Sequence, residues 1–146
     1  MLFRSRNLLE CPLTQQQLRE LSVLALAHVG DGVYELLVRG HVVSGGHAQK
    51  AAQMHKQTVR WVSAGAQATF ARTMEQEGFL TEEEVQVLLR GRNAKPKTIP
   101  KHAGLEAYAY ATGLECLFGY LYLLGRNERI DQLWQAVVAE IDPVQV

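Results

Sequence analysis

The sequence predicts an all-α domain of six or seven helices. Apolar residues recur at helical spacing along most of the chain, and helix-capping patterns precede two of these stretches. No segment shows the clean alternation of apolar and polar residues that is typical of a half-buried strand. At 146 residues the chain can bury a hydrophobic core of its own, so we expect residues 1–146 to form one domain.

The first helix is predicted to start at Thr14, because Thr14 and Gln17 have the spacing of a capping box. Apolar residues continue at helical spacing to Ala25. A second stretch, or a continuation of the first, covers about residues 32–43 and ends at the Ser-Gly-Gly sequence of residues 44–46.

A third helix is expected from near His47 through Trp61, and residues 62–74 continue or restart it before Gly78 ends the run. A second capping box begins at Thr81, whereas residues 93–104 contain two prolines and are predicted to form a loop. The remaining helices are expected over residues 81–92, 105–124 and 127–141.

A single carboxylate interrupts the most apolar part of the first half. Asp31 is the only formal charge between residues 21 and 34, and it lies between Gly30 and Gly32. A buried carboxylate without a partner costs several kcal/mol, and each glycine costs roughly 1 kcal/mol relative to alanine within a helix. We therefore expect another part of the molecule to approach this backbone closely, and some group to compensate the charge.

The apolar helix of residues 105–124 contains a matching carboxylate, Glu115. Small side chains at Ala111, Thr112 and Gly119 share its helical face, so another helix can come close there. Strongly apolar helices pack centrally and against each other, which would bring Asp31 and Glu115 together. Two carboxylates repel in a poorly solvated place, and a divalent cation such as Mg²⁺ or Mn²⁺ relieves that repulsion.

Simpler interpretations of these acids remain. Either carboxylate could cap a backbone or pair with an arginine or histidine, and Asp31 could be an N-cap after a helix that ends at Gly30. Glu35, one turn after Asp31, is expected to be a solvated helix acid. Because two acids each stand alone in an apolar helix with a glycine close by, we favour a metal site formed by Asp31 and Glu115.

The formal net charge is zero, but the charges are sorted along the chain. No acid occurs between residues 36 and 74, where Arg39, Arg60 and Arg72 are expected on a solvated face. Residues 88–105 again lack acids, and a basic loop there suits the phosphates of double-stranded RNA, which is recognised mainly by shape. The predicted RNA-binding residues are Arg90, Arg92, Lys95, Lys97 and Lys101.

Other chemistries find little support. The sequence has no Walker loop, no G-x-S-x-G and no H-E-x-x-H, and its histidines lack zinc-ligand spacing. Trp61 and Phe70 are expected to be core residues. His55 could face the core or a phosphate, and the core is favoured. The two cysteines are far apart and predicted to be free thiols, and no signal peptide or membrane span is expected, so a cytoplasmic location is predicted.

Four blocks in order resemble the Mini-III ribonucleases, short ribonuclease III-like enzymes of bacteria and plastids. They are LALAHVGDGVYELLVR, MHKQTVRWVSAGAQA, LLRGRNAK and YAYATGLECLFGYLYLLG, and the match spans about residues 21–133. The resemblance implies an α-helical endonuclease domain that forms homodimers and cuts double-stranded RNA with Mg²⁺. It places Asp31 and Glu115 at the family's metal-binding, catalytic acids.

The chain departs from the full-length ribonuclease III pattern, since Leu24, Ala27 and Thr112 stand where that pattern has acids. We expect no counterpart of the separate double-stranded-RNA-binding domain of full-length relatives, and we therefore expect the basic loop to hold the RNA. The expected products carry 5′-phosphate and 3′-hydroxyl ends, because the cation orients and activates water, and no histidine or lysine base is needed.

The resemblance suggests ribosomal RNA precursors as the substrate, and a plastid stroma as the location if the host bears plastids. Two other functions remain open at this point. The chain could be a non-catalytic helical RNA-binding domain of a ribonucleoprotein, or a purely structural dimer module. Metal-dependent cleavage of RNA would distinguish the endoribonuclease from both alternatives. Binding of an RNA duplex would distinguish the RNA-binding domain from the structural dimer module.

Overall fold

The computed structural model describes residues 13–45, 50–94 and 104–141. These residues form seven α-helices and no strand, which confirms the predicted all-α class. The helices are α1 (Gln15–Glu20), α2 (Val23–Ser44), α3 (Ala51–Val62), α4 (Ala64–Gln76), α5 (Glu82–Arg92), α6 (Leu105–Leu123) and α7 (Asn127–Ile141).

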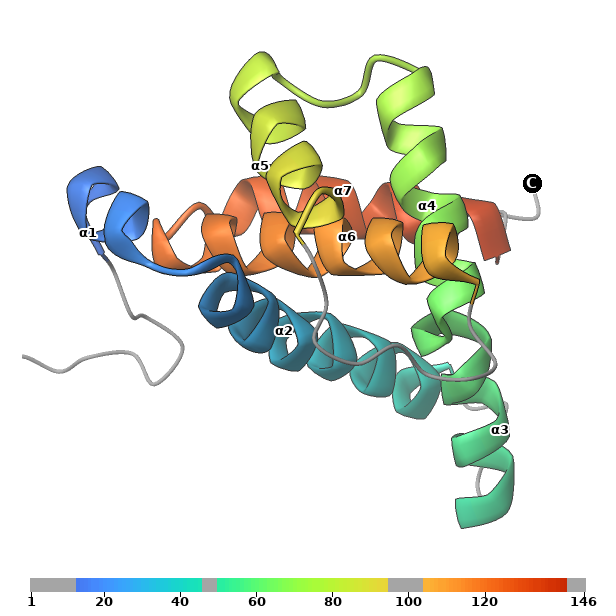
Figure 1. Cartoon of the computed structure of the whole chain (residues 1–146). Helices are drawn as coiled ribbons and strands as arrows, with labels where there is room; N and C mark the ends of the chain where they lie inside the picture. Colours follow the sequence, from blue (N-terminus) through green and yellow to red (C-terminus); the bar gives the residue numbers. More distant parts are fainter. Residues whose placement is uncertain (1–12, 46–49, 95–103, 142–146) are drawn as a thin grey trace, which may run out of the picture.

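Helix α6 lies at the centre of the fold and contacts α2, α4, α5 and α7 (Figure 1). In Figure 1, α2 runs along one side of α6, α4 and α5 stand on the other side, and α7 lies behind it. This arrangement follows from composition, because α6 is apolar on every face, and a helix of that kind must be covered on all sides.

The helix boundaries follow the capping chemistry. Thr14 and Thr81 open α1 and α5 with the predicted capping boxes. The expected extension of the first helix to Ala25 is wrong, because Leu21 is extended and the Ser22 side chain accepts a hydrogen bond from the Ala25 amide to start α2.

The third predicted helix is two helices. Ser63 ends α3 and also caps the start of α4, by accepting a hydrogen bond from the Ala66 amide. The predicted start at His47 lies outside the described residues. Gly78 has a positive φ of 66° just beyond α4, as expected of a residue that ends a helical run.

Helix α2 passes through Gly30, Asp31 and Gly32 without a break. Asp31 therefore lies in the interior of a 22-residue helix, and the alternative in which it caps a new helix after Gly30 is wrong. The buried residues of this helix pack toward α6 and hold it in register.

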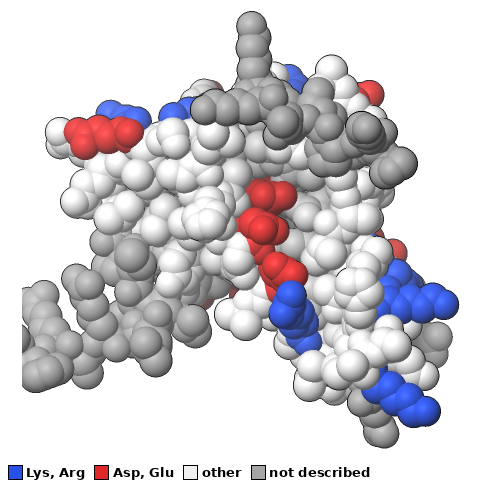
Figure 2. All heavy atoms as spheres, turned by 60° about the horizontal axis from the view of Figure 1, so that its bottom comes forward, with Lys and Arg blue, Asp and Glu red and all other residues white. Residues whose placement is uncertain are grey.

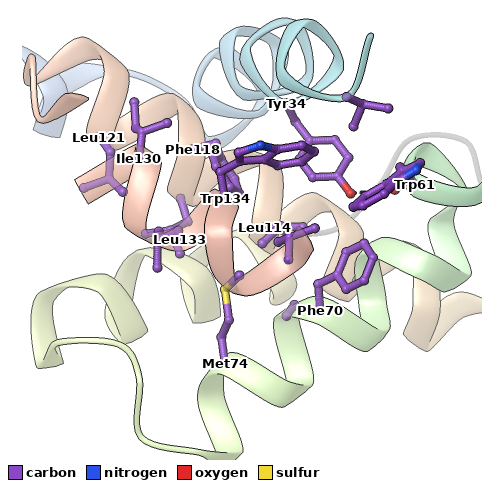
Figure 3. Close-up of a cluster of buried hydrophobic side chains, with 14 of the residues drawn as sticks. Tyr34, Trp61, Phe70, Met74, Leu114, Phe118, Leu121, Ile130, Leu133 and Trp134 are labelled. Carbon is purple, nitrogen blue, oxygen red and sulfur yellow. Dashed lines mark hydrogen bonds between the residues drawn. The ribbon is translucent and has the colours of Figure 1, made fainter. Parts of the chain in front are cut away.

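The core is rich in aromatic side chains (Figure 3). Trp61 and Phe70 are buried, as predicted, and Trp61 packs against Trp134 with ring centroids 5.5 Å apart. Tyr34, which is fully buried, donates a hydrogen bond from its hydroxyl to the Trp61 carbonyl at 2.6 Å. Because Tyr34 lies one turn after Asp31, this anchor fixes the rotation of α2 and so the direction in which Asp31 points. His55, expected in the core, is exposed.

No helix within the described ranges is long and apolar enough to cross a membrane. Helix α6 contains four tyrosines and Glu115, and it is the central packing helix that the sequence predicted.

A buried ion pair fastens α5 to α7. Glu84 is only 2% exposed and accepts two hydrogen bonds from Arg129, each 2.8 Å long. Burial by itself would raise the pKa of the Glu84 carboxyl, but the hydrogen bonds from Arg129 and Thr81 outweigh it and hold that pKa below its ordinary value.

Glu84→Gln is expected to lower the free energy of unfolding by about 2 to 4 kcal/mol at pH 7, because it leaves the half-buried Arg129 without its counter-charge. The glutamine oxygen can still accept from the Thr81 amide and preserve the capping box, but the amide nitrogen cannot replace Oε2 as the acceptor for Nε of Arg129. The pKa of Glu84 is lower in the folded protein than in the unfolded one. The extra stability of the wild type over the variant is therefore complete above the unfolded-state pKa, and it is lost as the pH falls through the folded-state pKa. Urea unfolding of both proteins between pH 3 and 7 measures this. A difference that does not change with pH would contradict the assignment.

Candidate active site

Helices α2 and α6 cross with their backbones in direct contact. A Cβ atom added to Gly30 would lie 1.6 Å from the Glu115 carbonyl oxygen, and one added to Gly119 would lie 2.1 Å from the Leu26 carbonyl oxygen. No side chain fits at either position. The close approach that the sequence predicted is therefore real and requires these two glycines, whereas a Cβ on Gly32 would meet nothing within 4 Å.

The crossing brings Asp31 and Glu115 to the same place. Asp31 directly follows Gly30 on α2, and the Glu115 carbonyl is the atom nearest to Gly30 on α6. Glu115 is half-buried between the helices. Asp31 is exposed, which corrects the expectation of two buried acids: its helix lies at the surface, and its side chain is on the solvent side of the crossing.

The two acids interact electrostatically. Burial, and then the charge of Asp31, raise the pKa of Glu115 to about 8. Burial also raises the pKa of Asp31, the charge of Glu35 raises it further, and His28 partly opposes these effects. Asp31 thus ionises first, and without a cation Glu115 stays mainly protonated at neutral pH.

Acidic side chains form a short row on this face of the molecule, with a basic side chain at one end (Figure 2). Figure 2 shows the side that lies at the bottom of Figure 1, where α2 runs. The residues linked there by charge interactions or an ion pair are Glu115, Asp31, Glu35 and Arg39.

The donor set of Asp31 and Glu115 fits a divalent cation. Both groups offer carboxylate oxygens, the ligands that Mg²⁺ and Mn²⁺ prefer. Burial and then the charge of Asp31 raise the pKa of Glu115, and a cation would relieve both effects. Among the described residues, no three Asp, Glu, His or Cys side chains are grouped closely enough to hold one ion together. Mg²⁺ commonly binds through one or two carboxylates and keeps several waters, so two acids suffice.

The structure places only two of the five predicted RNA-binding residues. Arg90 is exposed and donates a hydrogen bond to the Leu21 carbonyl at 3.0 Å. Arg92 stacks over the Tyr110 ring and donates to the Tyr110 hydroxyl at 3.2 Å, so it is tied to α6. Lys95, Lys97 and Lys101 lie outside the described residues.

Sequence reasoning did not find a cavity of about 310 Å³ between α2 and α3. Arg39 and His55 line it, together with apolar residues and Thr58. The exposure of His55 on α3 could have been expected from its polar and basic neighbours Gln53, Lys56 and Gln57.

The fold and the acidic pair define an all-α domain in which two carboxylates from neighbouring helices meet at the surface. The family model described as "Ribonuclease III domain" matches residues 24–126. Mini-ribonuclease 3 of Clostridium tetani is 39% identical over 125 residues, which cover 86% of this chain and 82% of that protein. Mini-ribonuclease 3 of a Thermoanaerobacter species is 42% identical over 130 residues, 89% of each chain.

The chain belongs to the ribonuclease III family, in its Mini-ribonuclease 3 group, and is an endoribonuclease. Family members depend on a divalent metal ion. An X-ray crystal structure of a Fusobacterium nucleatum protein has the same fold, with a TM-score of 0.75 and 27% identity over 85% of this chain and 97% of that one.

Proposed function

We propose that the chain is a Mg²⁺-dependent endoribonuclease that cleaves double-stranded RNA and leaves 5′-phosphate and 3′-hydroxyl ends. The observation that carries this proposal is the meeting of Asp31 and Glu115 at the Gly30–Gly119 crossing, in a chain whose relatives are Mini-ribonuclease 3 proteins. Mn²⁺ is the expected substitute for Mg²⁺, since it has similar ligand preferences.

Asp31 and Glu115 would hold the cation. When bound, a divalent cation lowers the pKa of water toward neutrality and stabilises negative charge on a phosphoryl group. Asp31 is exposed, so an RNA backbone can reach it from solvent, whereas Glu115 reaches the site from the half-buried side of the crossing. The two residues therefore orient the reacting groups from two different helices, and the backbone contact fixes their spacing.

Ribosomal RNA precursors are the proposed biological substrate, and the cytoplasm, or a plastid stroma in a plastid-bearing host, is the proposed location. The buried, free Cys116 is compatible with a reducing compartment. Both proposals rest on the resemblance to Mini-III ribonucleases rather than on the geometry of the site.

The test uses end-labelled RNA as a duplex and as a single strand, each incubated with the purified protein and either Mg²⁺ or EDTA. We expect cleavage of the duplex with Mg²⁺ only, and products that a 5′-phosphate-dependent exonuclease degrades. Duplex binding without cleavage under all conditions would contradict the proposal and favour a non-catalytic RNA-binding domain.

Replacing Lys95, Lys97 and Lys101 together by glutamine is expected to weaken duplex binding by about tenfold or more at moderate salt and to make its salt dependence shallower. For each phosphate contact that is lost, RNA binding releases about one counterion fewer. Binding measured by fluorescence anisotropy from 50 to 300 mM salt tests this. Replacing Lys50 and Lys56 by glutamine is the control, because both lysines lie outside the basic loop. This variant is expected to keep the salt dependence of the wild type. An unchanged salt slope in the triple variant would show that the loop is only a solvated face.

A homodimer is also proposed, because one site per subunit lets a dimer cut both strands of a duplex. Helix α2 exposes Leu36, which is 60% exposed beside an apolar cavity lined by Val33, Leu37 and Ile130. An exposed apolar patch of this kind supports a helical interface.

Leu36→Glu is expected to convert a dimer into a monomer at micromolar concentration, because a charge would be buried in the interface. Light scattering measures the mass, and circular dichroism checks the fold. Leu105→Glu is the control, because Leu105 is equally exposed and is the first residue of α6, where an acid is favourable. A wild-type monomer that still breaks both strands would refute the dimer.

A further inference from the structure

Glu35 lies next to the proposed metal site but does not belong to the pair that defines it. It follows Asp31 by one turn of α2, on the same face, and after burial its charge is the next cause that raises the pKa of Asp31. Its side chain is 37% exposed, less than that of Arg39 at 66%. Glu35 is thus partly sheltered on the side of the helix that carries Asp31.

Arg39 holds Glu35 in place. The Arg39 Nη2 donates a hydrogen bond to Oε1 of Glu35 at 2.7 Å. Arg39 is the one described side chain that the structure shows donating a hydrogen bond to Glu35. One oxygen is therefore fixed by the guanidinium, and the second carboxylate oxygen is a further acceptor on the helix face that carries Asp31.

Glu35 does not join Asp31 and Glu115 as a third ligand in this structure, because no three acidic, histidine or cysteine side chains of the described residues form one ion-binding group. A cation held by two carboxylates keeps several of its waters. Acceptors that lie one water away from a metal orient those waters, and such outer residues typically change metal affinity ten- to a hundredfold.

We propose that Glu35 is an outer-shell acid of this metal centre, positioned by Arg39, whose second carboxylate oxygen accepts hydrogen bonds from the waters that the cation retains. This inference rests on the proposed function, since it deepens the metal site of Asp31 and Glu115. Glu35 and Arg39 are positioning residues, because each acts on the site through another group.

The pair could instead be an ordinary ion pair between neighbouring turns of a helix, which contributes little to stability. The charge of Glu35 would then influence a cation only through its field. The two possibilities predict opposite effects of removing Arg39. A pure field effect makes cation binding tighter when a nearby positive charge is lost, whereas loss of a positioning contact makes it weaker.

The experiment is calorimetric titration of Mn²⁺ into the full chain without RNA, for the wild type and the variants Glu35→Asp, Glu35→Gln and Arg39→Gln. We expect about tenfold or greater weakening for both Glu35 variants and a smaller weakening for Arg39→Gln. Glu35→Asp is the decisive variant, because it keeps the charge and shortens the reach by one methylene group. Glu140→Gln, an exposed acid on α7, is the control and should bind as the wild type does.

Wild-type affinity in Glu35→Asp together with tighter binding in Arg39→Gln would overturn the assignment, while leaving the site of Asp31 and Glu115 intact. Failure of the wild type itself to bind Mn²⁺ would overturn the metal site and this assignment with it. Thermal unfolding without metal, expected to be nearly the same for all variants, shows that they are folded.

Discussion

Asp31→Asn and Glu115→Gln are each expected to abolish RNA cleavage while leaving the helical fold intact. Each change keeps the shape of the side chain but removes one of the two charges that would hold the cation. A carboxamide does not replace that charge, so we expect the cleavage rate to fall on the order of a thousandfold or more. Rates on a labelled duplex with saturating Mg²⁺, measured together with circular dichroism, test this. Activity near that of the wild type in either variant would refute the site.

Stability without metal provides an independent readout of the same pair. Because the folded pKa of Glu115 is raised to about 8, its carboxylate costs stability increasingly as the pH rises from about 4.5 to 8. Glu115→Gln removes that cost, so in EDTA the variant should be more stable than the wild type by on the order of 5 kcal/mol above pH 8 and equal to it near pH 4. A variant less stable than the wild type at pH 8 would contradict the raised pKa of Glu115 and the cost of its half-buried, repelled carboxylate.

Gly30→Ala and Gly119→Ala are expected to destabilise the protein by about 3 kcal/mol or more each. The added Cβ atoms would overlap backbone carbonyl oxygens at 1.6 and 2.1 Å, and rigid backbone cannot move aside as a flexible side chain can. The helices must separate, and this displaces Asp31 from Glu115. Urea unfolding gives the loss of stability, and duplex cleavage under conditions where the variant is still folded gives the loss of activity.

Gly32→Ala is the matched control for these variants. Its Cβ would meet nothing within 4 Å, so the substitution is expected to stabilise α2 by about 0.5 to 1 kcal/mol through helix propensity alone. If Gly32→Ala and Gly30→Ala had the same effect on stability, the close crossing at Gly30 would be wrong.

The crossing itself could be predicted from the sequence. An acid without a compensating charge in each of two strongly apolar helices, with glycine beside Asp31 and one turn from Glu115, indicated both the packing of these helices and the meeting of the acids. Apolar content decides which helices are central, and glycine marks where backbones touch, so both signals are local and can be read from one sequence.

Other features of the fold and the site could not be predicted. They depend on which helix covers which face of its neighbour, and the sequence does not show how the helices pair. Gly91 and Gly113 form a second close contact, between α5 and α6, with a Cβ on Gly91 only 2.8 Å from the Gly113 Cα. Neither glycine lies beside a lone acid in an apolar helix, and Gly91 is flanked by two arginines of the basic stretch. Likewise, the exposure of Asp31 follows from the surface position of α2, and the pairing of Glu84 with Arg129 joins residues 45 positions apart.

The most direct test of the metal site is a crystal structure of the protein soaked in Mn²⁺, with anomalous diffraction recorded to locate the ion. We predict one strong anomalous peak per subunit, within coordination distance of carboxylate oxygens of both Asp31 and Glu115, and no such peak in Asp31→Asn crystals. A peak elsewhere in an active enzyme, or a peak at the crossing that survives Asp31→Asn unchanged, would contradict the assignment of these two acids as the metal ligands.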